Sequence, residues 1–412
     1  ISSVFITFSV LSCDKPETAH DFYILGQEQL EADQFEQAVS SFSKSIELDS
    51  SFYSAYFERG LSYHAIERYD EAIEDYTKVI LVDSFPVASF GNRGLSKYKK
   101  GDSVGAIEDY NTALLIDSTY SNAYYNRALI YRDAKHYTLA IDDFKLSIKY
   151  DSNSSNAYLE LGTIYGFTLD EKQKAIQYFS KAINLNSNYF EAYGNRGIIK
   201  GKLGEFDDAL IDYDKALRIK PNDAFSYGNR GYLYYQQNKL ELALNDYNRA
   251  LEIDPKSSLA LWHKGNLLVE YQRYKEEFDL FSKIVSIDSL DIDAINNKGM
   301  CYMEFKDYRL AYTEFNRIIK IDSNNIIAWG NRAEALSFLG DYEKALADYN
   351  KAISLDSTRG YLFTGRGKIK TKLWDYDDPC LDFDRAYDLG DKSAYEFIAK
   401  HCDLEELGYY TP

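Results

Sequence analysis

A group of four residue types returns along this chain: an aromatic residue, an Asn, an Arg and a small residue. It reads YGNRG at residues 193–197 and again at 227–231, with the variants FGNRG at 90–94, YYNRA at 124–128 and WGNRA at 329–333. An Arg side chain pairs with carboxylates, and an Asn side chain offers both a donor and an acceptor to a peptide group. The group therefore serves either a bound ligand or the scaffold itself.

The basic residue of the group has an acidic residue at a fixed distance. Nine basic residues stand directly before a recurring small residue: Arg59, Arg93, Arg127, Arg196, Arg230, Lys264, Lys298, Arg332 and Arg366. In eight cases an acid follows sixteen residues later: Asp75, Asp109, Asp143, Asp212, Asp246, Glu314, Asp348 and Asp382. We predict ion pairs that fix the geometry of neighbouring helices, since desolvation cancels much of their attraction. Lys264 meets Leu280 at this spacing, and Glu277, one helical turn earlier, is its expected partner instead.

The Asn of the group lies two residues before the small residue. Six residues share this position: Asn92, Asn126, Asn195, Asn229, Asn297 and Asn331. One step along a helix turns a side chain by about 100°, so these Asn side chains point away from the face that carries the Arg. The preceding residue is Gly at four places, namely Gly91, Gly194, Gly228 and Gly330. Because Gly weakens a helix, it implies the close approach of a ligand or of an adjacent helix.

Residues that perform catalysis are not grouped in this sequence. The five His residues are scattered without the paired spacing of a metal site, and no GxxxxGK[ST], GxGxxG or GxSxG stretch occurs. Clusters of acids recur at repeat-specific places and are expected to be solvated. We therefore expect no enzymatic activity, no catalytic residue, no metal site and no cofactor.

The elements that position these residues follow a period of 34. Gly26, Gly60 and Gly94 lie 34 residues apart, an Ala follows each Gly by twelve, and an aromatic residue follows that Ala by four. Between these positions apolar residues recur at helical spacing, and short stretches such as KGD or LGD separate two helices. This pattern resembles the tetratricopeptide repeat. The resemblance covers residues 19–390 as eleven repeats.

The resemblance implies an all-α fold: a right-handed α-solenoid superhelix of about eleven helix-turn-helix repeats. Residues 391–412 are expected to form a C-terminal capping helix and a tail. The fifth repeat carries one extra residue in its predicted turn, between Gly162 and Ala175, and the eighth has Glu277 where Ala is expected. These two repeats either form seams of the superhelix or stack normally. The first and fifth repeats lack both members of the predicted ion pair.

In this family the Asn position lines a groove in which Asn side chains hold an extended peptide. The resemblance therefore implies protein partners bound at Asn92, Asn126, Asn195, Asn229, Asn297 and Asn331, unless these residues only bond neighbouring helices. Aromatic residues at groove-side positions serve either as apolar platforms or in packing: Tyr23, Phe57, Tyr125, Tyr232, Tyr235 and Trp262. The basic residues Lys99, Arg132 and Lys202 do not reproduce the family's clamp for a terminal carboxylate.

The N-terminal stretch has the character of an export signal. Residues 1–12 form an apolar run without an initiator Met, and Val10-Leu11-Ser12-Cys13 resembles the lipobox of bacterial lipoproteins. We expect a truncated signal peptide, lipid attachment at Cys13 and a tether over 13–18, which implies a membrane-anchored protein at the periplasmic or outer-membrane face. A plain secretory signal and an apolar chain end are the alternatives.

The other three cysteines, Cys301, Cys380 and Cys402, form no CxxC pair. Cys380 and Cys402 are close enough in sequence to meet across two antiparallel helices. An exported protein permits a disulfide there. We nevertheless expect two free buried thiols, because Cys is among the most buried residue types.

The net charge of −18 excludes most partners that carry phosphate. An acidic surface repels nucleic acid and anionic lipid, so membrane contact is expected only through the lipid anchor. We predict a non-enzymatic protein-interaction scaffold of the bacterial cell envelope. The alternatives are an adaptor that delivers envelope enzymes to their substrates and a structural protomer that assembles with itself.

Overall fold

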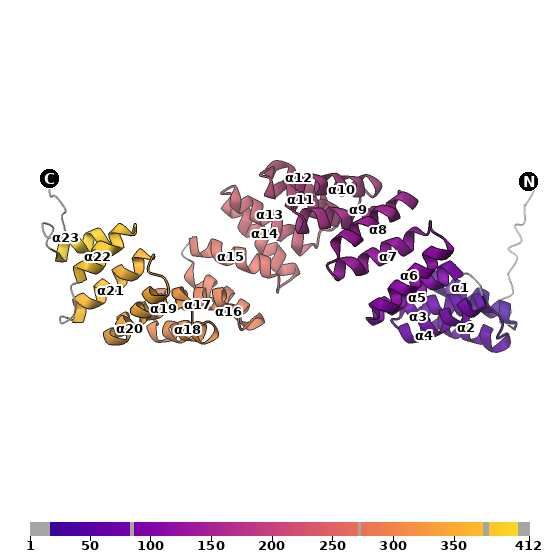
Figure 1. The fold of residues 1–412 in the computed structure, drawn as a ribbon, viewed down its shortest axis with the longest axis horizontal. Helices are drawn as coiled ribbons and strands as arrows, with labels where there is room; N and C mark the ends of the chain where they lie inside the picture. Colours follow the sequence, from indigo (N-terminus) through magenta and orange to yellow (C-terminus); the bar gives the residue numbers. More distant parts are fainter. Residues whose placement is uncertain (1–16, 83–85, 271–272, 374–378, 403–412) are drawn as a thin grey trace, which may run out of the picture. The chain divides into compact units, whose positions relative to one another are not determined.

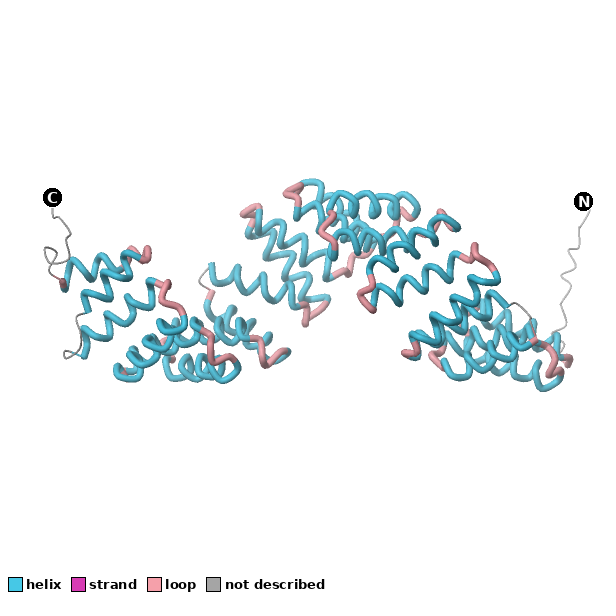
Figure 2. The backbone as a smooth tube through the Cα atoms, viewed as in Figure 1, coloured by secondary structure: helices cyan, strands magenta, loops and turns pink. Residues whose placement is uncertain are grey.

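The structure, a computed structural model, describes residues 17–82, 86–270, 273–373 and 379–402. Their regular structure is entirely helical (Figures 1 and 2). They form an α-solenoid of eleven helix pairs and one further short helix, which confirms the predicted fold class. The chain divides into two compact units between Ile219 and Lys220, and each is described by itself. The predicted signal peptide (1–12) and Cys13 lie outside the described residues.

The first unit contains repeats one to six. Its helices are α1 (Ala19–Glu31), α2 (Phe35–Leu48), α3 (Tyr53–Ala65), α4 (Tyr69–Leu81), α5 (Pro86–Lys100), α6 (Ser103–Ile116), α7 (Ser121–Asp133), α8 (Tyr137–Tyr150), α9 (Ser155–Thr163), the π-helix η1 (Ile164–Thr168), α10 (Lys172–Leu185), α11 (Phe190–Lys202) and α12 (Phe206–Ile219). We call the first helix of each repeat helix A and the second helix B. In the first five repeats of the unit, each helix B packs between its own helix A and the helix A of the next repeat.

The second unit contains repeats seven to eleven and the C-terminal helix. Its helices are α13 (Ala224–Gln236), α14 (Leu240–Ile253), α15 (Ser258–Glu270), α16 (Tyr274–Ile287), α17 (Ile292–Glu304), α18 (Tyr308–Ile321), α19 (Ile326–Leu339), α20 (Tyr342–Leu355), α21 (Gly360–Leu373), α22 (Pro379–Asp388) and α23 (Ala394–His401). The same order of packing continues along the pairs of this unit. The boundary between the units follows the sixth repeat, so the departures in the fifth and eighth repeats do not coincide with it.

The recurring small and aromatic residues form the core of each repeat. In the second repeat, a Cβ added to Gly60 would come within 2.8 Å of the ring of Tyr76, which is fully buried beside Ala72. Helix A therefore approaches helix B closely only because the side chain is missing. Burial of such a ring stabilises the fold by about 1.5–3 kcal/mol.

Two kinds of turn end the helices. Within a repeat, one residue takes a left-handed backbone conformation, as at Gly101 with φ +97°. Between repeats, an Asp at the end of helix B accepts a hydrogen bond from the backbone N–H two residues later. Asp117 does this for Thr119 at 2.8 Å. These local bonds stop the helix and turn the chain toward the next repeat.

The sequence predicted that the extra residue of the fifth repeat lies in the turn, and this prediction is wrong. The end of its helix A widens instead into the π-helix η1, where one additional residue fits within the same length of helix. Ile164 and Tyr165 of this segment remain buried. The insertion is thus absorbed inside the helix, and the core contacts of the repeat continue.

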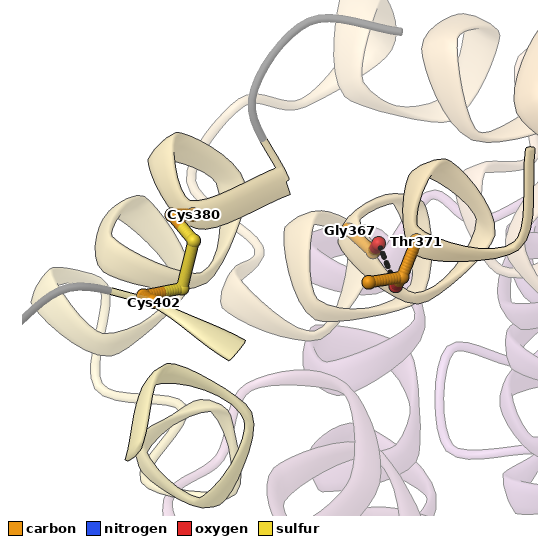
Figure 3. Close-up of a disulfide and its surroundings, with 4 residues drawn as sticks. All are labelled: Gly367, Thr371, Cys380 and Cys402. Atoms are coloured by element: carbon orange, nitrogen blue, oxygen red, sulfur yellow. Dashed lines mark hydrogen bonds between the residues drawn. A yellow bond between two sulfur atoms is a disulfide. The ribbon is translucent and has the colours of Figure 1, made fainter. Parts of the chain in front are cut away.

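The C-terminal helix α23 begins at Ala394, three residues later than predicted, and packs on the last repeat. Ala394 and Ile398 are fully buried against a cluster that includes Phe363 and Phe383. Cys380, in the first turn of α22, is bonded to Cys402 directly after α23, with 5.7 Å between their Cα atoms (Figure 3). The expectation of two free thiols is therefore wrong, because α23 folds back along α22 and brings the two residues together. Cys301 is free and buried.

Candidate peptide-binding surface

The predicted ion pairs are present, and each joins helix A to helix B. The Arg59 guanidinium donates from Nε and Nη2 to the two carboxylate oxygens of Asp75, at 2.7 and 2.8 Å. The same two-bond arrangement occurs in the pairs Arg93–Asp109, Arg127–Asp143, Arg196–Asp212, Arg230–Asp246, Arg332–Asp348 and Arg366–Asp382. Lys298 binds Glu314 at 2.7 Å. We call these pairs struts.

Six of the eight struts reach a third helix, which the sequence argument missed. Arg59 Nη1 donates to the Ser43 hydroxyl, at 3.0 Å, on helix B of the preceding repeat. The corresponding acceptors in other repeats are Thr77, Asn111, Ser180, Asn316 and Asn350. The sequence does contain a pattern that indicates this contact, because a polar residue stands sixteen positions before each of these Arg residues. The Arg therefore fixes one repeat and also ties it to the one before.

The aromatic residue of the recurring group belongs to the same arrangement. The ring of Tyr193 lies 5.6 Å from the guanidinium carbon of Arg196, and the ring of Trp329 lies 4.5 Å from that of Arg332. A guanidinium over an aromatic face gains cation–π attraction. Aromatic residue, Arg and small residue are thus all used by the scaffold.

The eighth repeat departs from this arrangement. Among the described residues no ion pair joins Lys264 to Glu277, so that expectation is wrong. Burial raises the pKa of the Glu277 carboxyl and that of the Cys301 thiol in the next repeat, and the charge of Glu277 raises the pKa of the thiol further. Burial also lowers the pKa of Lys264. The Lys264 amine is therefore desolvated like the basic residue of a strut, but within the described residues it has no acidic partner in an ion pair.

Three of the four glycines beside the Asn residues, Gly91, Gly228 and Gly330, serve the packing of successive repeats. A Cβ added to Gly91 would lie 2.8 Å from the Tyr120 hydroxyl, and one added to Gly228 would lie 2.6 Å from Leu259. Both neighbours precede or begin the next helix A. Of the two explanations that the sequence left open, adjacent structure rather than a ligand accounts for these glycines.

The six Asn residues all lie on helix A and are half-buried. Two of them bond within the chain. Asn229 donates to the backbone oxygen of Phe225, and Asn331 donates to the side-chain oxygen of Asn296, each at 2.9 Å. Within the part of the chain that the structure describes, the other four amides have no hydrogen-bond partner: Asn92, Asn126, Asn195 and Asn297. We call the six residues the Asn ladder.

The predicted aromatic platforms are mainly packing residues. Tyr23 packs on Phe52, with 4.8 Å between ring centroids, and Trp262 packs edge-on against the buried Phe281 at 5.5 Å. Tyr125 and Tyr232 make similar ring contacts, with Phe144 and His263. Such contacts explain the rings without a ligand.

Two of the three basic residues considered for a carboxylate clamp contact other groups of the chain. Arg132 binds Glu160 at 2.6 Å and Asp133 at 2.7 Å, and these hydrogen bonds outweigh desolvation and raise its pKa. Lys202 lies over the ring of Phe167 at 5.2 Å. Arg132 is already neutralised, so it is not available to a terminal carboxylate.

The described residues contain no group of three or more His, Cys, Asp or Glu residues able to hold a metal ion. Two of the His residues pack inside repeats, where burial lowers the pKa of both His64 and His263. Over the same residues, none of the helices has the length and apolar character needed to span a bilayer.

Comparison with solved structures finds many helical-repeat proteins. YrrB, described as a TPR protein with an unusual peptide-binding site, is 24% identical, with 43% of this chain and 92% of its own covered and a TM-score of 0.41. MamA is 33% identical over 40% of this chain and 96% of its own, with a TM-score of 0.37. Yeast Tom70 is 15% identical over 93% of this chain and 95% of its own, also with a TM-score of 0.37. These superpositions are likenesses only, because the TM-scores are below 0.5.

Comparison with curated proteins finds no match. Three family models of the tetratricopeptide repeat do match, and together they cover more than half of the chain. The matched residues are 23–88, 121–154, 155–189, 190–223, 224–257, 292–325 and 326–359. The period, the helix pairs and these matches agree. The chain belongs to the tetratricopeptide repeat family, whose repeats are protein-interaction modules.

Proposed function

We propose that this chain is an interaction scaffold whose Asn ladder holds an extended segment of a partner protein. The observation that carries the proposal is that three Asn side-chain amides of the first unit are half-buried and lack a hydrogen-bond partner within the described part of the chain. Asn92, Asn126 and Asn195 occupy the same position in their repeats, are half-buried, and have no hydrogen-bond partner among the described residues. An amide in this state is available to a peptide group, and each hydrogen bond contributes about 0.5–1.5 kcal/mol.

The struts support this role because they keep the ladder in place before a partner arrives. Each Asn of the first unit is followed directly by a strut Arg whose guanidinium is bonded to helices on both sides. A surface that is already ordered loses little conformational entropy on binding. The scaffold residues and the candidate binding residues therefore alternate along one helix.

The test is a triple variant, Asn92→Ala with Asn126→Ala and Asn195→Ala. Partners are captured from the cell envelope with the unaltered chain and identified, and the affinity of the tightest partner is then measured. We expect the triple variant to bind it at least about tenfold more weakly, the effect of losing roughly 1.4 kcal/mol. The matched control replaces the exposed Asn153, Asn184 and Asn188 of the same unit and keeps the affinity. Equal binding by both variants would refute the ladder.

We also propose that the chain is exported and anchored to the envelope through a lipid on Cys13. The lipobox-like sequence before Cys13 supports this proposal. The Cys380–Cys402 disulfide supports export independently, because such bonds persist in oxidising compartments. A fatty-acid probe fed to cells should label the full-length protein and fail to label Cys13→Ala, while Cys301→Ala retains the label. Labelling that survives Cys13→Ala would contradict the anchor.

A further inference from the structure

A pocket of about 330 Å³ lies in the second unit, between the tenth and eleventh repeats and the C-terminal helix. Glu334 and Phe338 of α19 form one wall, and Tyr361 and Lys368 of α21 form the other. Asn331 of the ladder also lines it. One Asn of the ladder, in the second unit, therefore lies at this pocket.

At one position of the pocket a neighbouring ring replaces the side chain that the sequence omits. The eleventh repeat has Gly365 where six other repeats carry the ladder Asn. A Cβ at Gly365 would come within 2.5 Å of the hydroxyl oxygen of Tyr349, which also lines the pocket. The phenol of Tyr349 thus takes the space of the missing side chain.

One charged group in the pocket is left without a partner. The Glu334 carboxylate has neither an ion pair nor a hydrogen bond within the described residues. Although it keeps access to solvent, the surrounding protein raises its pKa through desolvation, and the carboxylate of Glu304 adds to this, while Lys368 opposes it. A second carboxylate nearby makes this wall more attractive to a cation.

The other charged groups of the pocket are already engaged. The Lys368 ammonium lies over the ring of Phe397 at 4.5 Å. The Asp391 carboxylate accepts hydrogen bonds from the Thr364 hydroxyl at 2.5 Å and from the Ser393 hydroxyl at 2.7 Å. The pocket lining thus carries two carboxylates, those of Glu334 and Asp391, against the one ammonium of Lys368, so a cationic guest fits the charges better than an anionic one.

Aromatic rings stand beside the free carboxylate. Phe338 and Tyr361 are 56% and 43% exposed, so their rings are accessible to a guest at the walls of the pocket. Cations are attracted to aromatic faces, and a guanidinium additionally forms paired hydrogen bonds with a carboxylate. The net charge of −18 attracts basic partners to the whole protein.

We propose that this pocket binds a basic side chain, Arg or Lys, of the partner segment and so determines which sequences the scaffold accepts. The proposal rests on the proposed function in one respect, namely that the side chain belongs to an extended peptide. Recognition of the cation itself depends on Glu334 and the rings, and is independent of the ladder.

The test uses N-acetyl methylamide derivatives of Arg, Lys, Gln and norleucine as probes. Their dissociation constants for the full chain are measured by ligand-observed nuclear magnetic resonance. We expect the Arg or the Lys derivative to bind at least about tenfold more tightly than the other two, as one charge-assisted contact implies. Glu334→Gln should abolish this preference, and Glu343→Gln, at an exposed carboxylate on α20, should keep it. Equal binding of all four probes, or a preference that survives Glu334→Gln, overturns the proposal.

Failure of the ladder and failure of the pocket give different results. The small probes carry no extended backbone, so they report on the pocket even if the ladder binds no peptide. The triple Asn variant of the first unit lowers partner affinity without changing the preference for a basic probe. Thermal unfolding of Glu334→Gln at the temperature of the unaltered chain verifies that the variant is folded.

Discussion

The fifth and eighth repeats both lack the Arg–Asp strut, and they lack it in different ways. In the fifth repeat both partners are replaced, by Leu161, which is fully buried, and by Tyr178, which packs against the same core. In the eighth repeat only the acid is lost. Lys264 remains, its pKa lowered by burial, opposite Leu280.

This difference shows what a strut contributes. A buried pair exchanged for apolar residues of similar size costs little, because the desolvation of both charges disappears with their attraction. When one partner stays, its desolvation stays too. Repeats can therefore stack without a strut when both partners are replaced by uncharged residues. In the eighth repeat only the acid is replaced, so the desolvation of Lys264 remains.

Arg127→Leu is the strongest way to test the comparison. It leaves Asp143 buried without its counter-ion. The fourth repeat would then resemble the eighth, except that its unpaired residue is an acid and that of the eighth is a base. We expect a loss of about 3–5 kcal/mol in the free energy of unfolding, measured by urea denaturation. The double variant Arg127→Leu with Asp143→Tyr copies the fifth repeat and should recover most of the loss. A double variant as unstable as the single one would contradict our explanation.

Lys264→Leu completes the exchange in the eighth repeat and should stabilise the protein. We expect a gain of about 1–2 kcal/mol, while Lys275→Leu, at an exposed position of the same repeat, changes stability by less than about 0.5 kcal/mol. The pKa of Lys264 is lower in the folded state, so its cost applies in full below that pKa and is relieved as the pH rises toward the ordinary value of about 10.4. The advantage of the variant should therefore shrink in that range. A variant less stable than the parent at neutral pH would show that Lys264 has a stabilising contact.

Asn111→Ala tests the contact of the strut with the preceding repeat, and its effect should be the smallest. Asn111 accepts a hydrogen bond of 2.5 Å from Arg127 at a position that solvent reaches, so we expect a loss of about 1 kcal/mol. The equivalent residue before the fifth repeat is the exposed Lys145, which has no Arg to serve. Lys145→Ala should leave the urea midpoint unchanged. In the Arg127→Leu background, Asn111→Ala should have no further effect, and an undiminished effect there would place its role elsewhere.

Much of the fold could be predicted because it repeats. Eleven copies within one chain expose the positions that must stay small, aromatic or charged, and helical spacing decides which of them face each other inside a repeat. The pairing of Arg59 with Asp75 follows from a spacing that recurs in nearly every copy. The π-helix η1 could not be predicted from the spacing, because an inserted residue can be absorbed either in a turn or in a helix. Packing selects between these two outcomes.

The sequence predicted that the six Asn residues share one position on helix A, but not which of their amides are already hydrogen-bonded. Asn297 and Asn331 occupy the same place in neighbouring repeats, yet only Asn331 meets a side chain, Asn296, that accepts its hydrogen. Whether an amide is free depends on how one repeat stacks on the next. That stacking involves rotamers and neighbours that no single repeat contains.

The sequence by itself determined the helix pairs, their number and the pairing of Arg with Asp, because these depend on spacing within one repeat. Only the tertiary structure decided the contacts between repeats. It brought Tyr120 against Gly91, joined Cys380 to Cys402, and left Glu334 unpaired beside exposed rings. Each of these results depends on the distance between side chains on different helices, and close packing sets that distance for all neighbours together.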